Sequence, residues 1–243
     1  SGALWQRYLN EDNNSLVLLM PFDEDNSSTA FDNSSYNNNG ILSGATLNTT
    51  NCVTGTCYTF DGINDMINIT DPNNNLNILN AITIEAWINP NLVSPNQKIV
   101  GRWNDVGGRY SYLLSLSASG TGQISFIYNK AGVGNQFTTA NTILSANQWY
   151  YVVATYNTST ASVYINGVLN GSTAPGGTIV STSTSVGIGS GPEGNNPFNG
   201  SIDNVRIYNK ALTANEIQDH YEKYKLYYQP SFKFDGVNDF INI

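Results

Sequence analysis

The spacing of short apolar segments constrains the fold of this chain more than any other feature of its sequence. Segments that alternate apolar and polar residues, or are apolar throughout, recur about every 8–12 residues, with clusters of Gly, Asn, Asp and Ser between them. Residues 82–88, for example, are apolar at each even position, as expected for a half-buried strand. Asn166-Gly167, between the apolar runs 161–165 and 168–169, is typical of a type I′ hairpin turn. The pattern predicts an all-β protein, a two-sheet antiparallel sandwich.

One segment near the end of the sequence is expected to be helical instead. Residues 213–216 (Thr-Ala-Asn-Glu) have the spacing of a capping box, in which the Thr and Glu side chains satisfy each other's backbone N–H groups. Ile217, Tyr221 and Tyr224 follow on one helical face. We therefore predict one short helix after the strands.

Length, composition and charge limit the organisation and the partners of the chain. Its 243 residues and 40% hydrophobic content suit one large β domain, which we place at residues 15–226, between an N-terminal arm (1–14) and a C-terminal strand extension (227–243). A formal net charge of −8, with the ten Lys and Arg residues scattered, argues against nucleic acid as a partner. The sequence has no apolar run of membrane-spanning length and no signal-peptide pattern, so we expect no membrane span.

The two cysteines are expected to pair. Cys52 and Cys57 enclose Val-Thr-Gly-Thr, a turn-like sequence, and a disulfide across so short a loop contributes about 2 kcal/mol in the chain-entropy model. Free thiols are the alternative, although the pair lacks both the Cys-x-x-Cys spacing of redox sites and a histidine partner for zinc. A disulfide implies an oxidising compartment, and we predict an extracellular or cell-surface location.

Acceptor sites for N-glycosylation agree with that location. A chain so rich in Asn, Ser and Thr also produces the Asn-x-Ser/Thr sequence by chance. The predicted glycosylation sites are Asn13, Asn26, Asn33, Asn48, Asn68, Asn157, Asn170 and Asn199.

One stretch of the sequence occurs twice. Residues 60–69 (Phe-Asp-Gly-Ile-Asn-Asp-Met-Ile-Asn-Ile) are expected to form a strand end, a tight Asp-Gly turn and a second short strand. Residues 234–243 repeat them with only apolar-for-apolar changes. The copy is the start of a second tandem domain, an extra edge strand of its own domain, or a donor strand that completes the sheet of a neighbouring subunit. We favour the donor strand, with self-association into an oligomer or filament and subunit contacts through Phe232, Phe234, Val237, Phe240, Ile241 and Ile243.

Five segments, in a fixed order, share the pattern of one protein family. They are Leu-Leu-Met-Pro-Phe-Asp at 18–23, the polar loop 32–40, Phe-Asp-Gly at 60–62 with Asp65, residues 82–87, and a last combination of Trp-Tyr-Tyr-Val at 149–152, Tyr-Ile-Asn-Gly at 164–167, 200–208, Leu212 and Glu216-Ile217. Over about residues 15–224 the chain resembles the laminin-G-like jelly-roll domains of the concanavalin A-like lectin/glucanase superfamily. The resemblance implies two antiparallel sheets packed face to face, with one short C-terminal helix. It leaves the ligand open, because this fold carries enzymes, lectins and adhesive modules alike.

The residues argue against an enzyme. Retaining glucanases need paired carboxylates about 5–5.5 Å apart, which strands supply with a spacing such as Glu-x-Asp-x-x-Glu. The only histidine, His220, lies at a polar position of the predicted helix, so a Ser-His-Asp triad has no base. We expect a solvent-facing His220 and an outward-facing Glu85 on its strand. The glutamates show no paired pattern and stand at Glu11, Glu24, Glu85, Glu193, Glu216 and Glu222.

Calcium is the favoured cofactor. It binds six to eight oxygens from carboxylates, Asn side chains and backbone carbonyls, and the loop 32–40 is rich in both side chains. The resemblance places this loop against the strand that carries Asp203. The alternative is that these Asp and Asn residues only form turns. We predict a calcium site made by Asp32, Asn37, Asn39 and Asp203, completed by Asp23 or Asp25.

A sugar-binding surface is the second candidate site. Such sites combine an aromatic platform with a few polar groups, and two stretches offer them: Trp103-Asn104-Asp105 with Tyr110 and Tyr112, or the loop 189–196. Taken together, the sequence predicts a non-enzymatic extracellular protein, a structural or adhesive subunit linked to its neighbour by the C-terminal strand. The alternative is a calcium-dependent carbohydrate-binding module of a larger surface protein, with a glycan as its partner.

Overall fold

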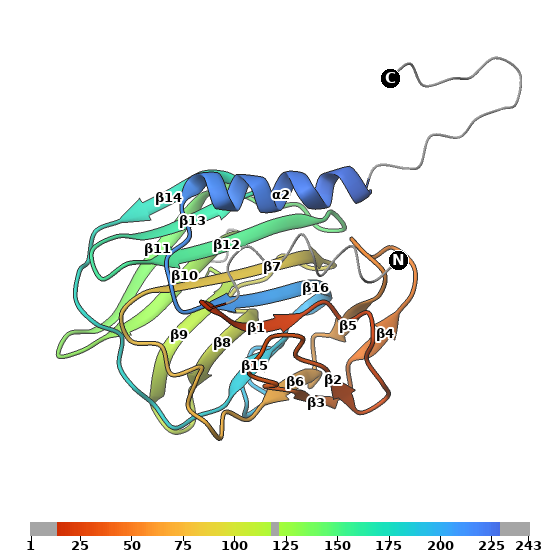
Figure 1. The fold of residues 1–243 in the computed structure, drawn as a ribbon, viewed down its shortest axis with the longest axis horizontal. Coiled ribbons are helices and arrows are strands. Elements are labelled where there is room, and N and C mark those ends of the chain that lie inside the picture. The colour runs from red at the N-terminus through yellow and green to blue at the C-terminus, as the bar shows by residue number, and fades with distance from the viewer. Residues whose placement is uncertain (1–13, 118–121, 229–243) are drawn as a thin grey trace, which may run out of the picture.

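The computed structural model describes residues 14–117 and 122–228, and it shows two antiparallel sheets packed face to face (Figure 1). The predicted all-β sandwich is confirmed. The first sheet has the order β14 (Val168–Thr173), β13 (Ala161–Ile165), β12 (Tyr150–Tyr156), β7 (Ile82–Pro90), β16 (Asn199–Tyr208), β5 (Cys57–Asp61) and β4 (Thr46–Asn48), with β1 (Leu16–Met20) also paired to β16. The second has the order β11 (Gly134–Ile143), β10 (Gln123–Lys130), β9 (Arg109–Leu116), β8 (Lys98–Asn104), β15 (Val186–Ile188), β6 (Met66–Ile69), β3 (Gly40–Ser43) and β2 (Thr29–Ala30).

The main core lies between the two sheets, as period-two alternation requires. On β7 the apolar residues at even positions, Ile82, Ile84, Ala86 and Ile88, are all fully buried in this core. The Asn166-Gly167 turn joins β13 and β14, and both residues have the positive φ of a type I′ turn (51° and 80°). The strand and the hairpin turn are confirmed as predicted, but β7 is buried on both faces rather than half-buried.

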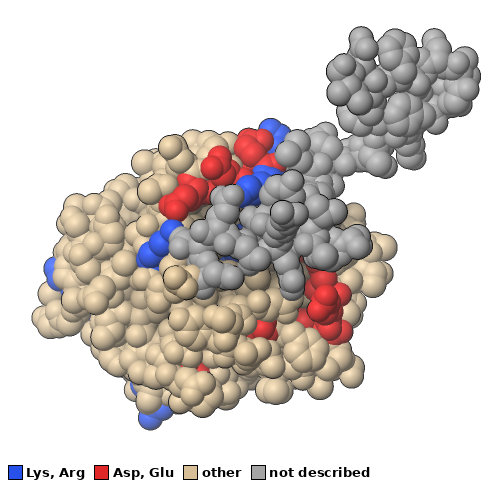
Figure 2. All heavy atoms as spheres, viewed as in Figure 1, with Lys and Arg blue, Asp and Glu red and all other residues tan. Residues whose placement is uncertain are grey.

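The single helix of the described chain, α2 (Ala214–Tyr228), lies along the outer face of the first sheet (Figure 1). It begins at the predicted capping box, in which the Thr213 N–H donates to Glu216 Oε2 (2.6 Å) and the Glu216 N–H donates to Thr213 Oγ1 (3.3 Å). Tyr221 stacks on Trp87 of β7 with ring centroids 5.8 Å apart. Figure 2 shows that the visible face carries few charges and that several of them follow this helix. No helix of the described chain is both long and apolar enough to cross a membrane.

The helix overturns two expectations. Glu85 is 0% exposed rather than outward-facing, and His220 turns towards it, with Nδ1 2.9 Å from Glu85 Oε1. The reason is that α2 covers the outer face of β7, so the odd positions of that strand face the helix instead of water. Arg206 of β16 lies on the other side of the same carboxylate, with Nη1 3.4 Å from Glu85 Oε2, so Glu85, His220 and Arg206 form one buried cluster.

The stretch 60–69 links the two sheets, since β5 belongs to the first and β6 to the second. Phe60, Ile67 and Ile69 are fully buried, and Ile63 in the turn is 74% exposed. The strand–turn–strand prediction for this stretch is confirmed. Its copy at 234–243 and all predicted subunit contacts lie outside the described residues, as do most of the N-terminal arm and Asn13.

Candidate functional site

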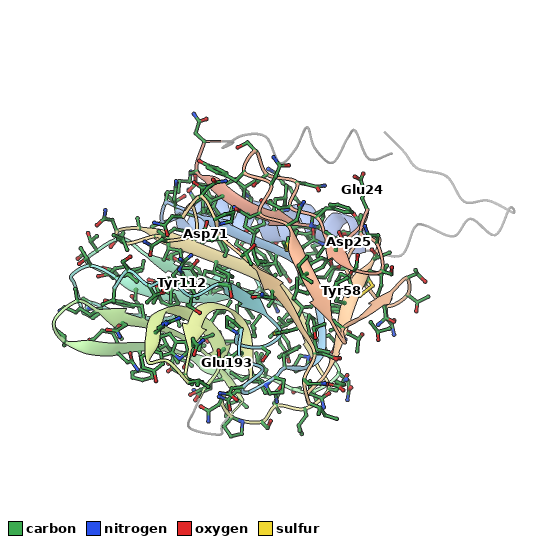
Figure 3. The ribbon with its side chains drawn as sticks, turned by 90° about the horizontal axis from the view of Figure 1, so that it is seen from below. Glu24, Asp25, Tyr58, Asp71, Tyr112 and Glu193 are labelled. Carbon is green, nitrogen blue, oxygen red and sulfur yellow. A yellow bond between two sulfur atoms is a disulfide. The ribbon has the colours of Figure 1, made fainter. Side chains whose placement is uncertain are left out.

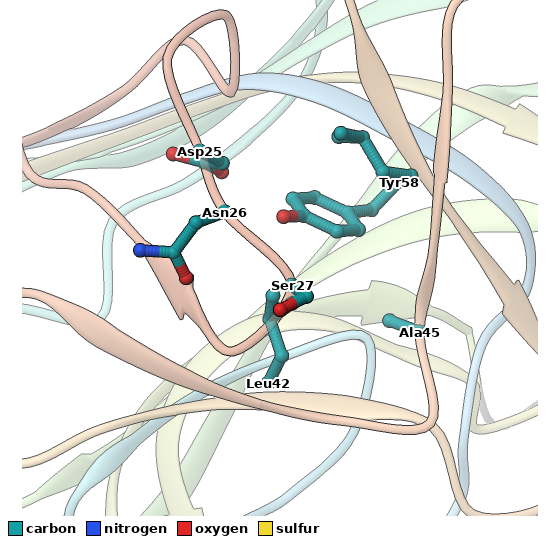
Figure 4. Close-up of a pocket in the computed structure, with 7 residues that line it drawn as sticks. Asp25, Asn26, Ser27, Leu42, Ala45 and Tyr58 are labelled. Atoms are coloured by element: carbon teal, nitrogen blue, oxygen red, sulfur yellow. The ribbon is translucent and has the colours of Figure 1, made fainter.

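A pocket of about 390 Å³ opens at one end of the sandwich, between the loop that follows β1, the β3–β4 connection and β5 (Figure 4). Its volume falls in the range of about 300–1,000 Å³ that is usual for small-molecule sites. Figure 3 shows Asp25 and Tyr58 together at this end, away from Tyr112 and Glu193. The lining residues are Asp25, Asn26, Ser27, Leu42, Ala45, Leu47 and Tyr58.

Strand pairing builds the apolar wall of the pocket. Leu47 on β4 pairs with Tyr58 on β5, and Leu42 on β3 comes from the opposite sheet. The Tyr58 ring is fixed from behind by Phe22, edge to face, with ring centroids 5.0 Å apart. Phe22 has a φ of 67°, unusual for a bulky residue, and this turns the chain from β1 into the loop that carries Asp25.

The polar side of the pocket is formed by a carboxyl and a phenol from different segments of the chain. Tyr58 is 1% exposed, and its hydroxyl, which points towards the 25–27 loop in Figure 4, interacts as a donor with the Asp25 carboxyl. Asp25 Oδ1 also accepts a hydrogen bond from the Phe31 N–H (2.8 Å). The pocket therefore places a buried carboxyl–phenol pair beside an apolar wall.

Burial sets the protonation of both groups. It raises the pKa of Asp25 to about 6, and the charges of Asp23 and Glu24 add to this rise, while the hydrogen bonds from the Phe31 N–H and the Tyr58 hydroxyl oppose it. Burial likewise raises the pKa of the Tyr58 phenol. At neutral pH the carboxyl is thus mainly an acceptor and the phenol a donor.

Asp32, predicted to bind calcium, accepts hydrogen bonds from the protein at both oxygens. Oδ1 accepts from the N–H groups of Leu19 (2.8 Å) and Ser34 (2.9 Å), while Oδ2 accepts from Ser34 Oγ (2.8 Å) and the Asn38 N–H (2.7 Å). Asn39 Oδ1 in turn accepts from the Asp32 N–H (2.9 Å). These bonds attach the loop 32–39 to the edge of β1 that β16 leaves free. Asn37 forms a turn in the same loop, with a φ of 54°.

The other predicted ligands, Asp203 and Asp23, hold the disulfide loop instead. Cys52 and Cys57 form the predicted disulfide, with an S–S distance of 2.09 Å. Asp203 Oδ2 accepts from the N–H groups of Val53 (2.9 Å) and Thr54 (3.1 Å), and Asp23 Oδ1 accepts from that of Thr56 (2.9 Å). Burial raises the pKa of both carboxyls.

The predicted calcium ligands thus fall into two groups. Asp32, Asn37 and Asn39 belong to the loop at β1, whereas Asp23 and Asp203 accept hydrogen bonds from the disulfide loop. Within 14–117 and 122–228, no three or more His, Cys, Asp and Glu side chains gather as a metal would require. Calcium remains a prediction.

The two stretches proposed for sugar binding turn out to be neighbours. Trp103 and Tyr110 stack with ring centroids 4.6 Å apart. Glu193, from the loop 189–196, accepts hydrogen bonds at Oε1 from Lys98 Nζ (3.0 Å) and from the Asp105 N–H (3.1 Å), which ties that loop to the end of β8. Trp103 itself is buried. Tyr112 belongs to the core instead, where its hydroxyl donates to the Leu76 carbonyl (2.8 Å).

The glycosylation sequences differ in accessibility. Three of the asparagines are exposed: Asn26, Asn33 and Asn157. In three others the side-chain Nδ2 donates a hydrogen bond: Asn48 to Thr59, Asn170 to Thr142 and Asn199 to Asp61. Asn68 is half-buried on β6. Glycosylation remains a prediction.

Sequence reasoning singled out Asp25 only as a spare calcium ligand and did not single out Tyr58. A signal was present, because Tyr58 and Phe60 lie on the same face of β5 and Phe60 is a core residue. A tyrosine on a core-facing position needs a partner for its hydroxyl, and the sequence near Tyr58 offers none within its own strand.

Comparisons with known proteins agree with this architecture. The sequence model of the concanavalin A-like lectin/glucanases superfamily matches residues 60–218. An adhesion G-protein coupled receptor V1 of Danio rerio is 27% identical over 156 residues, which are 58% of this chain and only 2% of that receptor.

Solved structures share the fold at low sequence identity. The binding domain of Paraclostridial Mosquitocidal Protein 1 matches with a TM-score of 0.68 and 18% identity, over 87% of this chain and 53% of that one. Domain 4 of an extracellular arabinanase from Geobacillus stearothermophilus, solved with arabinotriose, matches with a TM-score of 0.66 and 19% identity, over 84% of this chain and 97% of that one. The ligand-binding domain of botulinum neurotoxin serotype D, solved with N-acetylneuraminic acid, has a TM-score of 0.64 and 19% identity, over 87% and 51%. The sandwich and the match over residues 60–218 show that the chain belongs to the concanavalin A-like lectin/glucanases superfamily.

Proposed function

We propose that this chain is an extracellular, non-catalytic binding module that takes a glycan into the pocket between β3, β4 and β5. The observation that carries the proposal is the pocket itself, about 390 Å³ in volume, in which an apolar wall lies beside the polar groups of Tyr58, Asp25, Asn26 and Ser27. A sugar residue has the matching surface, with an apolar C–H face and hydroxyl groups at its rim. The disulfide supports an oxidising location.

The comparisons support the same function. The arabinanase domain was solved with arabinotriose and the neurotoxin domain with N-acetylneuraminic acid, so this fold accommodates sugars in other proteins. The matched relative is an adhesion receptor, which agrees with a surface module. Glycosidases need two carboxyl groups across the scissile bond, and of the residues that line the pocket Asp25 alone carries one.

Filling the pocket is expected to weaken glycan binding strongly. Ala45 lies in the turn between β3 and β4, and Ala45→Trp would place an indole where the ligand enters. We expect the affinity for glycans that bind the wild-type protein on an array to fall at least tenfold, about 1.4 kcal/mol. Val168→Trp, at an exposed position of β14, is the matched control and should bind as the wild type does. Equal binding by the Ala45 variant would refute the pocket as the site.

Self-assembly through the C-terminal strand is a second candidate function. The copy 234–243 aligns with 60–69, whose residues Phe60, Ile67 and Ile69 enter the core while Ile63 stays exposed. A copy that docks in the same way would bury Phe234, Ile241 and Ile243 in a neighbouring sheet. Val237, which the sequence alone placed among the subunit contacts, would then stay outside like Ile63.

Calcium also remains a proposal: the charge of Asp23 helps to raise the pKa of Asp203, and a cation between them would relieve this repulsion.

Substitutions in the copy test assembly on the full chain. Phe234→Asp should convert oligomers into monomers, measured by light scattering across a concentration series, because a buried carboxylate would face the neighbouring core. Val237→Asp should leave the oligomers intact, since its counterpart Ile63 is 74% exposed. A wild-type chain that stays monomeric at all concentrations would refute self-assembly through the C-terminal strand.

A further inference from the structure

The two sides of the sandwich, where the edge strands of its sheets face each other, are built differently. On one side β14 of the first sheet and β11 of the second are joined by side chains: the Thr142 N–H donates to Asn170 Oδ1 (2.7 Å), and Asn170 Nδ2 donates to Thr142 Oγ1 (2.8 Å). The other side, which lies away from β14 in Figure 1, has β4 at the end of the first sheet and β3 and β2 at the end of the second. The pocket of about 390 Å³ lies between these edges.

The edge strand β4 offers its outer edge to a further strand. Among residues 14–117 and 122–228, β4 pairs with β5 on one edge and with no strand on the other. The N–H and C=O groups of such an edge are a template for strand addition, which proteins often prevent with charged residues or proline. The stretch 44–50 contains neither. Leu47 is 38% exposed and lines the pocket, so an added strand would also gain an apolar contact.

The chain contains a second segment with the pattern of the strand that β4 already pairs with. On β5, Tyr58 pairs with Leu47, and residues 58–61 are Tyr-Thr-Phe-Asp. Residues 232–235, which lie outside the described part of the chain, are Phe-Lys-Phe-Asp. The repeat of 60–69 therefore extends two residues further towards the N-terminus, with an aromatic residue again at the first position. A segment of this pattern has the side chains that suit a partner of β4.

We infer that the outer edge of β4 and the adjoining pocket are the acceptor site for residues 232–235 of a second copy of this chain, an inference that rests on self-assembly as the candidate function. The added strand runs antiparallel to β4, as β5 does on the inner edge. Phe232 and Phe234 are two residues apart and so share one face of the added strand, which turns towards Leu47 and the pocket. Lys233 faces the solvent. Docking of the strand and binding of a glycan exclude each other, because both use the same pocket.

A matched pair of leucine variants tests the acceptor site in the full chain. Leu47 and Leu169 both lie on edge strands of the first sheet, are 38% and 53% exposed, and pair with a tyrosine of the next strand. Leu47→Lys places a charge on the proposed edge and should raise the concentration at which oligomers form at least about tenfold, measured by light scattering. Leu169→Lys, on the closed side, should assemble as the wild type does. Both should keep the melting temperature of the wild type within a few degrees, because exposed substitutions change stability little.

Mixing two defective variants gives the sharper result. Leu47→Lys keeps an intact donor strand, and Phe234→Asp keeps an intact acceptor edge. Each should be monomeric alone, and an equimolar mixture should form dimers but no larger species, because one donor and one acceptor remain. The dimer would also show that Leu47→Lys is folded.

Three results would overturn the acceptor site: oligomers of Leu47→Lys at wild-type concentrations, equal loss of oligomers in Leu169→Lys, or a mixture that stays monomeric. In each of them Phe234→Asp still decides self-assembly through the C-terminal strand separately. A monomeric wild type would refute both.

Discussion

Glu85→Gln is expected to lower the free energy of unfolding by about 3–5 kcal/mol, the usual cost of breaking a buried ion pair from one side. Glu85 is 0% exposed and lies between Arg206 and His220. Arg206 is 1% exposed, so the variant would leave its charge buried without a carboxylate. The matched control is Glu216→Gln, whose side chain is 39% exposed and pairs with Lys210, and which should cost less than about 1 kcal/mol through its ion pair.

The large loss of stability expected for Glu85→Gln follows from the position of the Glu85, Arg206 and His220 cluster between α2 and the sheet. Arg206 also donates to the Tyr224 hydroxyl, and Tyr224 donates to Asn204 Oδ1 (2.9 Å), so the cluster joins the helix to β7 and β16. Urea denaturation measures the change. A loss below about 1 kcal/mol for Glu85→Gln would contradict the buried pair.

Glu85 and its partners also make the stability of the protein depend on pH. Burial alone would raise the pKa of Glu85, but the charges and hydrogen bond of His220 and Arg206 hold it below its ordinary value. A lowered pKa in the folded state contributes stability above the unfolded pKa of about 4.3 and loses it as the pH falls further. The wild type should therefore lose stability below about pH 4.3 more steeply than Glu85→Gln does.

Asp32→Ala is expected to cost at least about 3 kcal/mol, because the N–H groups of Leu19, Ser34 and Asn38 would each lose an acceptor worth about 1–3 kcal/mol. The loss would release the loop 32–39 from the free edge of β1. Asp61→Ala is the control: Asp61 also accepts backbone N–H bonds, from Ile63 (2.7 Å), but in an exposed turn. We expect a cost below about 1 kcal/mol there.

The Asp32→Ala variant also tests calcium binding. If the proposed cation is held by the loop of Asp32, calcium should raise the melting temperature of the chelator-treated wild type and not that of Asp32→Ala. A rise in both proteins would assign the cation to Asp23 and Asp203 instead. No rise in either would contradict calcium binding and leave these carboxylates as hydrogen-bond acceptors only.

Local chemistry made the elements of the fold predictable. The even positions of 82–88 had to share one face, the capping box of Thr213 had to begin a helix, and Asn166-Gly167 had to turn a hairpin. The environment of the odd positions was not predictable in this way. Whether Glu85 faces water or a helix depends on where α2 packs, and α2 comes from a distant part of the sequence.

The candidate site was harder to predict for a related reason. The side-chain oxygens of Asp and Asn can either accept a hydrogen bond from a backbone N–H or coordinate a cation. The composition of 32–40 therefore did not separate the two roles. The pocket needs 25–27, 42–47 and Tyr58 to meet, and only the pairing of β3 with β6 and of β4 with β5 brings them together. The same applies to Trp103 and the loop 189–196, which sequence reasoning treated as alternatives.

The location of a bound glycan tests the central claim most directly. Amide chemical shifts of the isotopically labelled protein can be followed during titration with a neutral glycan selected on an array. The pocket predicts that the largest shifts cluster at residues 25–27, 42–47 and 58. Shifts that cluster around Trp103, Tyr110 and Glu193 instead would place the ligand beside β8, β9 and the loop 189–196 and contradict the assignment.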